Sequence, residues 1–134
     1  MIVFDTNLLV RLATNDVPAD RQVVVALLEG NDVFISKTVL LETEWVLRSR
    51  YDYSGPQVMN FLDYLAALPS VLLEDEATVF MAMESVRQGL DFADALHLAS
   101  AGGEPFYTLD RVLHRKAKRL SGVRVELLRR GRRA

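Results

Sequence analysis

The chain has 134 residues, half of them hydrophobic, with a formal net charge of −2 and no cysteine. This length fits one domain with a real core, and the lack of cysteine excludes disulfide frameworks, thiolate zinc sites and cysteine nucleophiles. No apolar run reaches the roughly 20 residues of a membrane span, and no signal-peptide pattern opens the chain, so we expect a cytoplasmic protein.

Short apolar runs alternate with segments of helical periodicity along the chain. We expect strands at residues 2–4, 33–35, 71–73, 106–108 and 123–125. We expect helices at residues 7–13, 19–28, 39–50, 57–68, 74–88, 91–101 and 110–120. This alternation indicates βαβ units and a parallel sheet covered by helices on both faces. Because no linker interrupts the pattern, we expect one domain over residues 1–128 and a basic, disordered tail over 129–134.

The first expected strand ends at Asp5, which Thr6 and Asn7 follow directly. Ligands of parallel α/β sheets bind at the carboxyl ends of the strands, so Asp5 stands where a functional carboxylate is expected. Aspartate and threonine are also common N-caps of helices. At this point a capping role and a chemical role for Asp5 are equally good interpretations.

Further acids fall where expected strands give way to helices. Glu42 lies one turn into the helix after the second strand, Asp91 and Asp94 open a helix, and Asp110 follows the fourth strand. Each of them alone has a structural interpretation, since Asp91 and Asp110 are good caps. Acids gathered at one edge repel one another unless a cation lies among them, and oxygen ligands suit Mg²⁺ or Mn²⁺. Together they favour a metal site.

Several neighbours of these acids allow a structural and a functional interpretation. The hydroxyls of Thr6 and Thr108 are suited to holding a carboxylate or a water. Glu44 lies only two positions after the previous acid of its helix, so we expect it to point away, on the surface. We expect His97, which has apolar neighbours, to be a partly buried residue, and Trp45 to pack rather than to stack on a base.

The basic residues are unevenly distributed along the chain. Ten of the 16 lie after Asp110, together with only one of the 18 acidic residues. This split suggests an acidic site beside a surface suited to phosphates, and its alternative is a solvated basic helix with a frayed tail. The phosphate-binding candidates of the last helix are Arg111, Arg115, Lys116, Lys118 and Arg119.

Four segments of the chain form an ordered set. They are FDTN at 4–7, TVLLE at 38–42, DFADALHLA at 91–99 and YTLD at 107–110. With this set the chain resembles the PIN-domain ribonucleases and, more closely, the VapC toxins of bacterial VapBC toxin–antitoxin pairs. The resemblance implies a three-layer α/β/α sandwich with a short-stranded, mostly parallel central sheet. It also implies an endoribonuclease that depends on Mg²⁺ or Mn²⁺.

The resemblance assigns roles to individual residues. The acidic quartet of the family matches Asp5, Glu42, Asp94 and Asp110 in this sequence. Its supporting polar residues match Thr6, Asn7, Asp91 and Thr108.

As a toxin of a type II toxin–antitoxin system, the protein would hydrolyse RNA phosphodiester bonds. Three of the acids, Asp5, Asp94 and Asp110, would then bind the metal directly. Glu42 would bind it through water or orient the nucleophile. The basic residues of the last helix become candidates for RNA binding, and a homodimer and a cognate VapB-like antitoxin are implied as partners.

Two other functions compete with this hypothesis. A nucleic-acid-binding or scaffold module without catalysis would use the basic carboxyl-terminal part, and its acids would only cap helices. The intact quartet argues against it. A phosphatase or a 5′-nuclease of related architecture would usually carry further acids or extra helices, which we do not find in the sequence.

Overall fold

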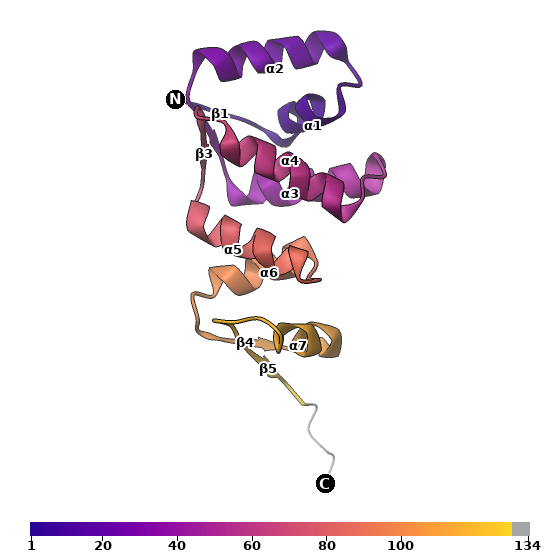
Figure 1. The fold of residues 1–134 in the computed structure, drawn as a ribbon, viewed down its shortest axis with the longest axis vertical. Coiled ribbons are helices and arrows are strands. Elements are labelled where there is room, and N and C mark those ends of the chain that lie inside the picture. Colours follow the sequence, from indigo (N-terminus) through magenta and orange to yellow (C-terminus); the bar gives the residue numbers. More distant parts are fainter. Residues whose placement is uncertain (130–134) are drawn as a thin grey trace. The chain divides into compact units, whose positions relative to one another are not determined.

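The computed structural model describes residues 1–129, in which seven helices and five short strands alternate (Figure 1). The strands are β1 (Ile2–Val3), β2 (Val33–Ile35), β3 (Val71–Leu73), β4 (Pro105–Thr108) and β5 (Arg124–Leu127). The helices are α1 (Thr6–Thr14), α2 (Pro18–Gly30), α3 (Lys37–Arg50), α4 (Gly55–Ala67), α5 (Glu76–Arg87), α6 (Phe92–Ser100) and α7 (Arg111–Ala117). Every predicted element is confirmed, with ends that differ by a few residues.

Several helices begin at residues whose chemistry suits a helix start. The Ser36 hydroxyl accepts a hydrogen bond from the Val39 amide at 3.2 Å at the start of α3. Ser54 and Gln57 form a reciprocal capping box at the start of α4. Pro18, whose ring fixes a helical φ and whose nitrogen has no hydrogen to satisfy, opens α2. These local signals explain why the helix starts were readable from the sequence.

All strand pairs among the described residues are parallel. One ladder has the order β1-β2-β3, with Val33 opposite Ile2 and Val71, and the other joins β4 to β5. Parallel neighbours require a crossover, and helices supply it between successive strands of each ladder. The predicted class, a helix-rich α/β fold of short parallel strands, is confirmed.

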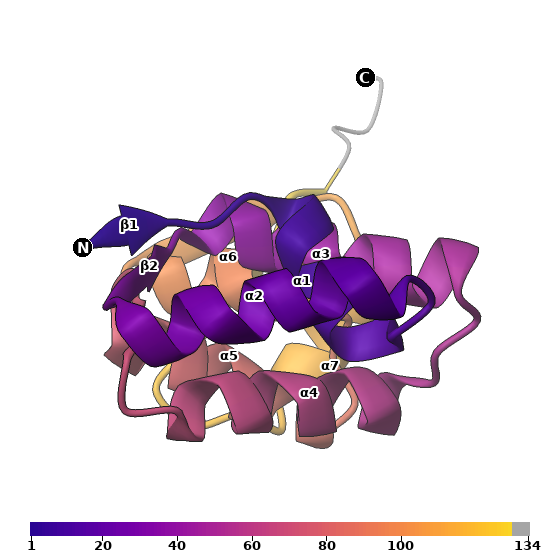
Figure 2. The same cartoon turned by 90° about the horizontal axis from the view of Figure 1, so that it is seen from above.

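The chain divides into two compact units, residues 1–76 and the residues from 77 onward. In the first unit, α1 packs against α2 and α3, α3 packs against α4, and α4 contacts β3. Figures 1 and 2 show the strands of this unit at one end of its helices. Its core includes Leu9, Val24, Ile35, Leu47 and Leu65, which are almost fully buried.

In the second unit, α7 contacts both β4 and β5. Met83, Phe92, Leu98 and Leu113 are buried there. No helix within residues 1–129 is both long and apolar enough to cross a bilayer. The single domain expected over residues 1–128 remains a prediction, and residues 130–134 of the expected tail lie outside the described residues.

Candidate functional site

Asp5 lies directly after β1 and is the N-cap of α1. Its carboxylate accepts a hydrogen bond from the backbone N–H of Thr6 at 2.7 Å, and its side chain is exposed. The capping interpretation is therefore confirmed. It does not compete with a chemical role, because a carboxylate has about four acceptor positions and one N–H uses only one of them.

Thr6 connects the start of α1 to the middle of α3. Its side chain is buried, with 7% of its surface exposed, and its hydroxyl donates a short hydrogen bond to Oε1 of Glu42. Glu42 itself is exposed, but one oxygen of its carboxylate accepts this hydrogen bond from the buried Thr6 hydroxyl. This hydrogen bond fixes the direction of the Glu42 carboxylate, which would otherwise be free to rotate on its flexible side chain.

An open cleft of about 360 Å³ lies in the first unit around these residues. Its walls are formed by α1, α3 and the turn after α3, and its lining residues are Asp5, Thr6, Asn7, Val10, Arg11, Glu42, Trp45, Val46, Arg50 and Tyr51. The first unit thus brings together four of the residues singled out in the sequence: Asp5, Thr6, Asn7 and Glu42. Acidic, amide, hydroxyl, aromatic and basic groups all line one concave surface.

The sequence analysis does not place Trp45, Arg50 or Tyr51 at the candidate site, yet all three line the cleft. Trp45 was expected to pack, but 54% of its surface is exposed and it lines the cleft together with Arg50 and Tyr51. The available signal was helical spacing, because Trp45 follows Glu42 by three positions and therefore projects from the same side of α3.

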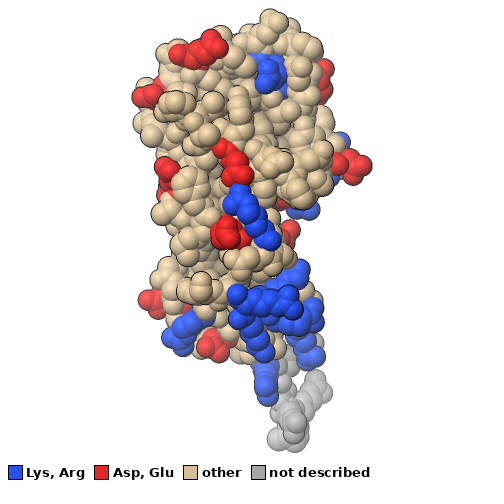
Figure 3. All heavy atoms as spheres, viewed as in Figure 1, with Lys and Arg blue, Asp and Glu red and all other residues tan. Residues whose placement is uncertain are grey.

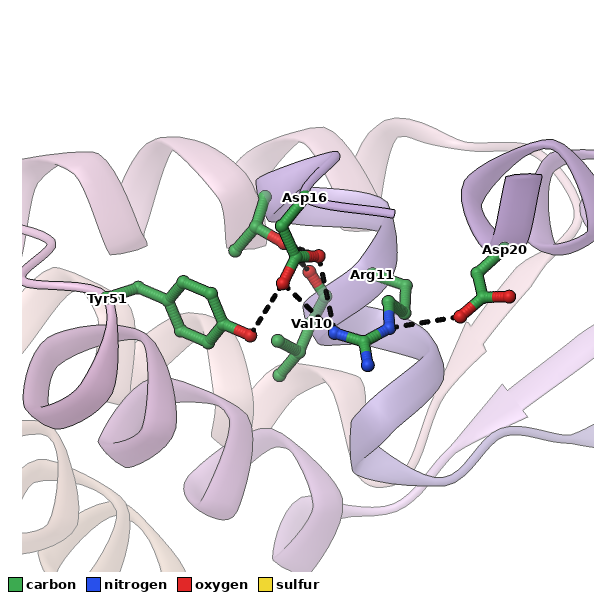
Figure 4. A network of polar contacts seen from close by, with 6 residues as sticks. Val10, Arg11, Asp16, Asp20 and Tyr51 are labelled. Atoms are coloured by element: carbon green, nitrogen blue, oxygen red, sulfur yellow. Dashed lines mark hydrogen bonds and ion pairs between the residues drawn. The ribbon is translucent and has the colours of Figure 1, made fainter. Parts of the chain in front are cut away.

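A polar network fixes the part of the cleft rim near Arg11 (Figure 4). The guanidinium of Arg11 lies 3.1 Å from Asp16 and 3.2 Å from Asp20. Asp16 accepts further hydrogen bonds from the Thr14 hydroxyl at 2.8 Å and the Tyr51 hydroxyl at 2.9 Å. The carboxylate of Asp16 raises the pKa of Arg11, and the hydrogen bond from Thr14 is the main cause of the lowered pKa of Asp16. Arg11 is therefore already neutralised by protein groups.

The prediction for Glu44 is wrong, because this residue is buried with only 4% of its surface exposed. It shares a stripe of α3 with Leu40, Thr43 and Leu47, at helical spacings of three and four. Arg48, one turn further along, forms a close ion pair with Glu44, and its Nη2 donates to Oε1 at 3.0 Å. The partner one turn away is what allows the charge to be buried.

Asp94 lies in the first turn of α6, in the second unit, and is partly buried. Burial raises the pKa of Asp94 above its ordinary value, and the negative charges of Asp91 and Asp110 raise it further. His97 and Lys116 act in the opposite direction and do not overcome these effects. The second unit therefore brings three predicted site residues close enough for their charges to repel.

Asp91 and Asp110 differ in how they begin their helices. Asp91 occupies the N-cap position of α6 but makes no side-chain capping hydrogen bond. Asp110 is a capping residue for α7, since its Oδ1 accepts from the amides of Val112 at 2.9 Å and Leu113 at 3.0 Å. The Thr108 hydroxyl accepts from the Asp110 amide at 3.0 Å, which further fixes the turn between β4 and α7.

The surface around α7 is basic. Arg111, Arg115, Lys116, Lys118 and Arg119 are all exposed, as expected for groups that contact phosphates. Figure 3 shows Lys and Arg side chains gathered over the part of this unit that contains α7.

One residue of α6 departs from its expected position. His97 is exposed, so the prediction of a partly buried histidine is wrong. It lies on the side of α6 that its apolar neighbours Leu96 and Leu98, both buried, leave to solvent.

The chemistry of the predicted quartet fits a hard divalent cation. The donors are carboxylate oxygens with nearby hydroxyl and amide groups, which suit Mg²⁺ or Mn²⁺. Burial is the main cause of the raised pKa of Asp94, and the negative charges of Asp91 and Asp110, which a cation would offset, add to it. Within residues 1–129, no group of three or more His, Asp or Glu side chains is close enough together to hold a metal ion without rearrangement.

The family model described as the PIN domain matches residues 2–120, which include every residue of the predicted quartet. Comparison with curated proteins finds no matching relative. The match spans most of the chain and covers both cleft-lining acids and the acids of the second unit. The chain therefore belongs to the PIN domain family.

Proposed function

We propose that the protein is a metal-dependent endoribonuclease that acts as the toxin of a type II toxin–antitoxin system, as in the VapC toxins. The observation that carries this proposal is the position of Asp94, partly buried and beside the carboxylates of Asp91 and Asp110. A fold gains nothing in stability from crowding like charges. Such an arrangement is characteristic of sites at which a cation or a proton is handled.

The residues that would hold the ion are the four acids of the quartet. Asp5, Asp94 and Asp110 would bind Mg²⁺ or Mn²⁺ directly, and Glu42 would act through a water molecule. When bound, the ion supplies a water of lowered pKa and stabilises negative charge on the scissile phosphate.

Other residues of the chain would orient the acids and the RNA. The Thr6 hydroxyl holds the Glu42 carboxylate, so this acid is directed before substrate arrives. Asn7 lines the same cleft and offers an amide that can donate to a phosphate oxygen. The basic residues of α7 would contact flanking phosphates, which gives an affinity that falls steeply with salt.

The substrate we propose is single-stranded or looped RNA, whose bases are accessible to a protein. The proposed partners are a second copy of the chain and a VapB-like antitoxin, all in the cytoplasm. An antitoxin segment would block the site most directly by placing an arginine among the acids, because guanidinium and carboxylate groups pair in a bidentate geometry.

The test is cleavage of a mixed pool of structured RNA by the purified protein with Mg²⁺, with Mn²⁺ and with EDTA. Cleavage should require metal and fall by at least about 100-fold in Asp94→Asn, because the site loses a negative ligand. Glu104→Gln is the matched control, since it removes an exposed carboxylate of the same unit. Full activity of Asp94→Asn would contradict the assignment.

The basic surface of α7 favours one alternative, a nucleic-acid-binding module without catalysis. In that case wild type and Asp94→Asn would both bind RNA in a salt-dependent manner and neither would cut it. Any antitoxin carried through purification must first be removed, for example by unfolding and refolding, because a bound inhibitor gives the same result.

A further inference from the structure

The cleft of the first unit contains a large aromatic surface without an assigned role. The indole of Trp45 is 54% exposed and makes no ring contact with another aromatic side chain of residues 1–129. Its position three residues after Glu42 places it one helical turn from a predicted catalytic acid. An indole that is this exposed is poorly explained by packing, because it contributes little burial to the core.

Arg50 is the second unassigned group in this cleft. The first unit has five basic residues, and four of them are bonded to other protein groups. Arg11 pairs with two aspartates, Arg21 donates to the Leu12 carbonyl, Lys37 pairs with Asp75 and Arg48 pairs with Glu44. Arg50 makes no ion pair or side-chain hydrogen bond with any other residue that the structure describes. It therefore remains available for an anion from outside.

We propose that Trp45 and Arg50 form a nucleotide-binding subsite, in which a base of single-stranded RNA stacks on the indole and an adjacent phosphate pairs with the guanidinium. This inference rests on the proposed nuclease function, because it assigns a role in substrate binding to groups beside the predicted catalytic acids. Base stacking on an aromatic side chain tolerates any sequence, since every base has a flat π-face. The subsite therefore positions RNA without discriminating between base sequences.

The same cleft also has the size to accept a side chain from another protein. The observations favour RNA, because a nucleotide supplies both a flat ring for Trp45 and a negative charge for Arg50. An apolar side chain docked on the indole would leave the guanidinium without a partner. Burial of Trp45 by a protein partner is therefore an outcome that the experiment must separate from RNA binding.

The chain provides its own probe for this subsite, because Trp45 is its single tryptophan. We would titrate the full-length protein with a short oligouridylate in EDTA, so that metal-dependent cleavage does not occur, and follow indole fluorescence. A parallel titration would use an abasic oligonucleotide of the same length. The oligouridylate should quench the fluorescence strongly, and the abasic strand should bind more weakly and quench little, because it has no base to stack.

Variants then separate the two contacts, with affinity measured by anisotropy of a labelled oligouridylate. Trp45→Ala should weaken binding by about 5- to 100-fold, and Trp45→Phe should restore most of it. Arg50→Ala should weaken binding of both strands and lower the salt dependence of log K by about 0.7, the value for one lost phosphate contact in single strands. Tyr64→Ala, which alters an exposed aromatic of α4 outside the cleft, should change nothing.

Unchanged affinity of Trp45→Ala, or equal quenching by both strands, would overturn the subsite. The subsite would also be overturned if the Trp45 fluorescence changed only when a copurifying protein was bound and not when RNA was added. Failure here leaves the nuclease assignment intact if wild type cuts RNA with metal and Asp94→Asn does not. Conversely, base-dependent quenching by a protein that cuts nothing would support the subsite and contradict the nuclease function.

Discussion

The two units hold their acids in different ways. In the first unit, the acids have hydrogen-bond partners: Asp5 accepts from a backbone amide, Glu42 accepts from Thr6, and buried Glu44 is paired with Arg48. In the second unit, the nearest charges to Asp94 include two further carboxylates, and the pKa of Asp94 is raised. The acids of the first unit are matched with hydrogen-bond donors or a cation, whereas Asp94 is partly buried among like charges, even though its neighbour Asp110 caps α7.

This difference indicates that some acids are held in place by protein hydrogen bonds, whereas others lie where a ligand would stabilise them. Hydrogen bonds in the first unit set the directions of Asp5 and Glu42 before any ligand arrives. The acids of the second unit contribute unfavourable electrostatic energy that a cation would remove. We therefore expect changes in the first unit to alter mainly stability and geometry, and changes around Asp94 to alter mainly activity.

The largest effect on stability should come from breaking the ion pair between buried Glu44 and exposed Arg48 in the first unit. Arg48→Ala leaves the Glu44 carboxylate buried without its partner and should lower the free energy of unfolding by about 2.5 kcal/mol. Urea unfolding followed by Trp45 fluorescence measures this, since the indole lies on the same helix. The double variant Glu44→Leu, Arg48→Met should recover most of the loss, and no recovery would mean that the charge pair itself is required.

The next largest effect should come from Thr6. Thr6→Val keeps the shape of a buried side chain but removes the donor to Glu42, which should cost about 1.5 kcal/mol of unfolding free energy. Cleavage should also slow, because the Glu42 carboxylate loses its fixed direction. Thr6→Ser retains the hydroxyl and serves as the control in both assays. Equal behaviour of the valine and serine variants would contradict a directing role.

Asp110 allows capping and chemistry to be measured separately. Asp110→Ala removes the acceptor for two amides of α7 and should cost about 1 kcal/mol, measured by thermal unfolding. Asp110→Asn keeps a capping side chain and should lie within a few tenths of a kcal/mol of wild type. Both variants should lose cleavage. An asparagine variant that cuts at the wild-type rate would show that Asp110 is only a cap.

The smallest effect concerns the acid stability of the network around Arg11 (Figure 4). The pKa of Asp16 is lowered in the folded protein, so its contribution is present at pH values above about 4 and is lost as the pH falls through the lowered value. Asp16→Asn should therefore flatten the acid side of the stability profile slightly. Asp32→Asn, which removes another exposed carboxylate, should leave the profile unchanged.

The helices and strands could be predicted from the sequence because residues that favour helix starts and turns separate them. Ser36, Ser54, Pro18 and Gly89 stand at helix or turn positions that their chemistry favours. The division of five strands into two ladders was not readable, because pairing depends on contacts between distant segments. The sequence of a short apolar strand does not indicate which other strand it will pair with.

The candidate site was only partly predictable for a similar reason. Asp5 and Asp110 are candidates because they follow expected strands, and the structure shows that both are helix caps. The spacing of Glu44 from Glu42 predicts a surface residue, and we expect Trp45 to pack, but Glu44 is buried and Trp45 is exposed. Helical spacing gives the correct result, since Glu44 shares the apolar stripe of α3 and Trp45 shares the side of Glu42.

The caps formed by Asp5 and Asp110 have a consequence for how the sequence of this fold diverges. On the proposed function, a descendant that no longer cuts RNA would still need these aspartates to start α1 and α7, so selection for folding alone would preserve them. Asp94 makes no side-chain hydrogen bond with any residue in the described part of the chain, so under the proposed function only its catalytic role would retain it. Among related sequences, we expect the residue at this position to distinguish active enzymes from inactive descendants better than the number of acids that survive.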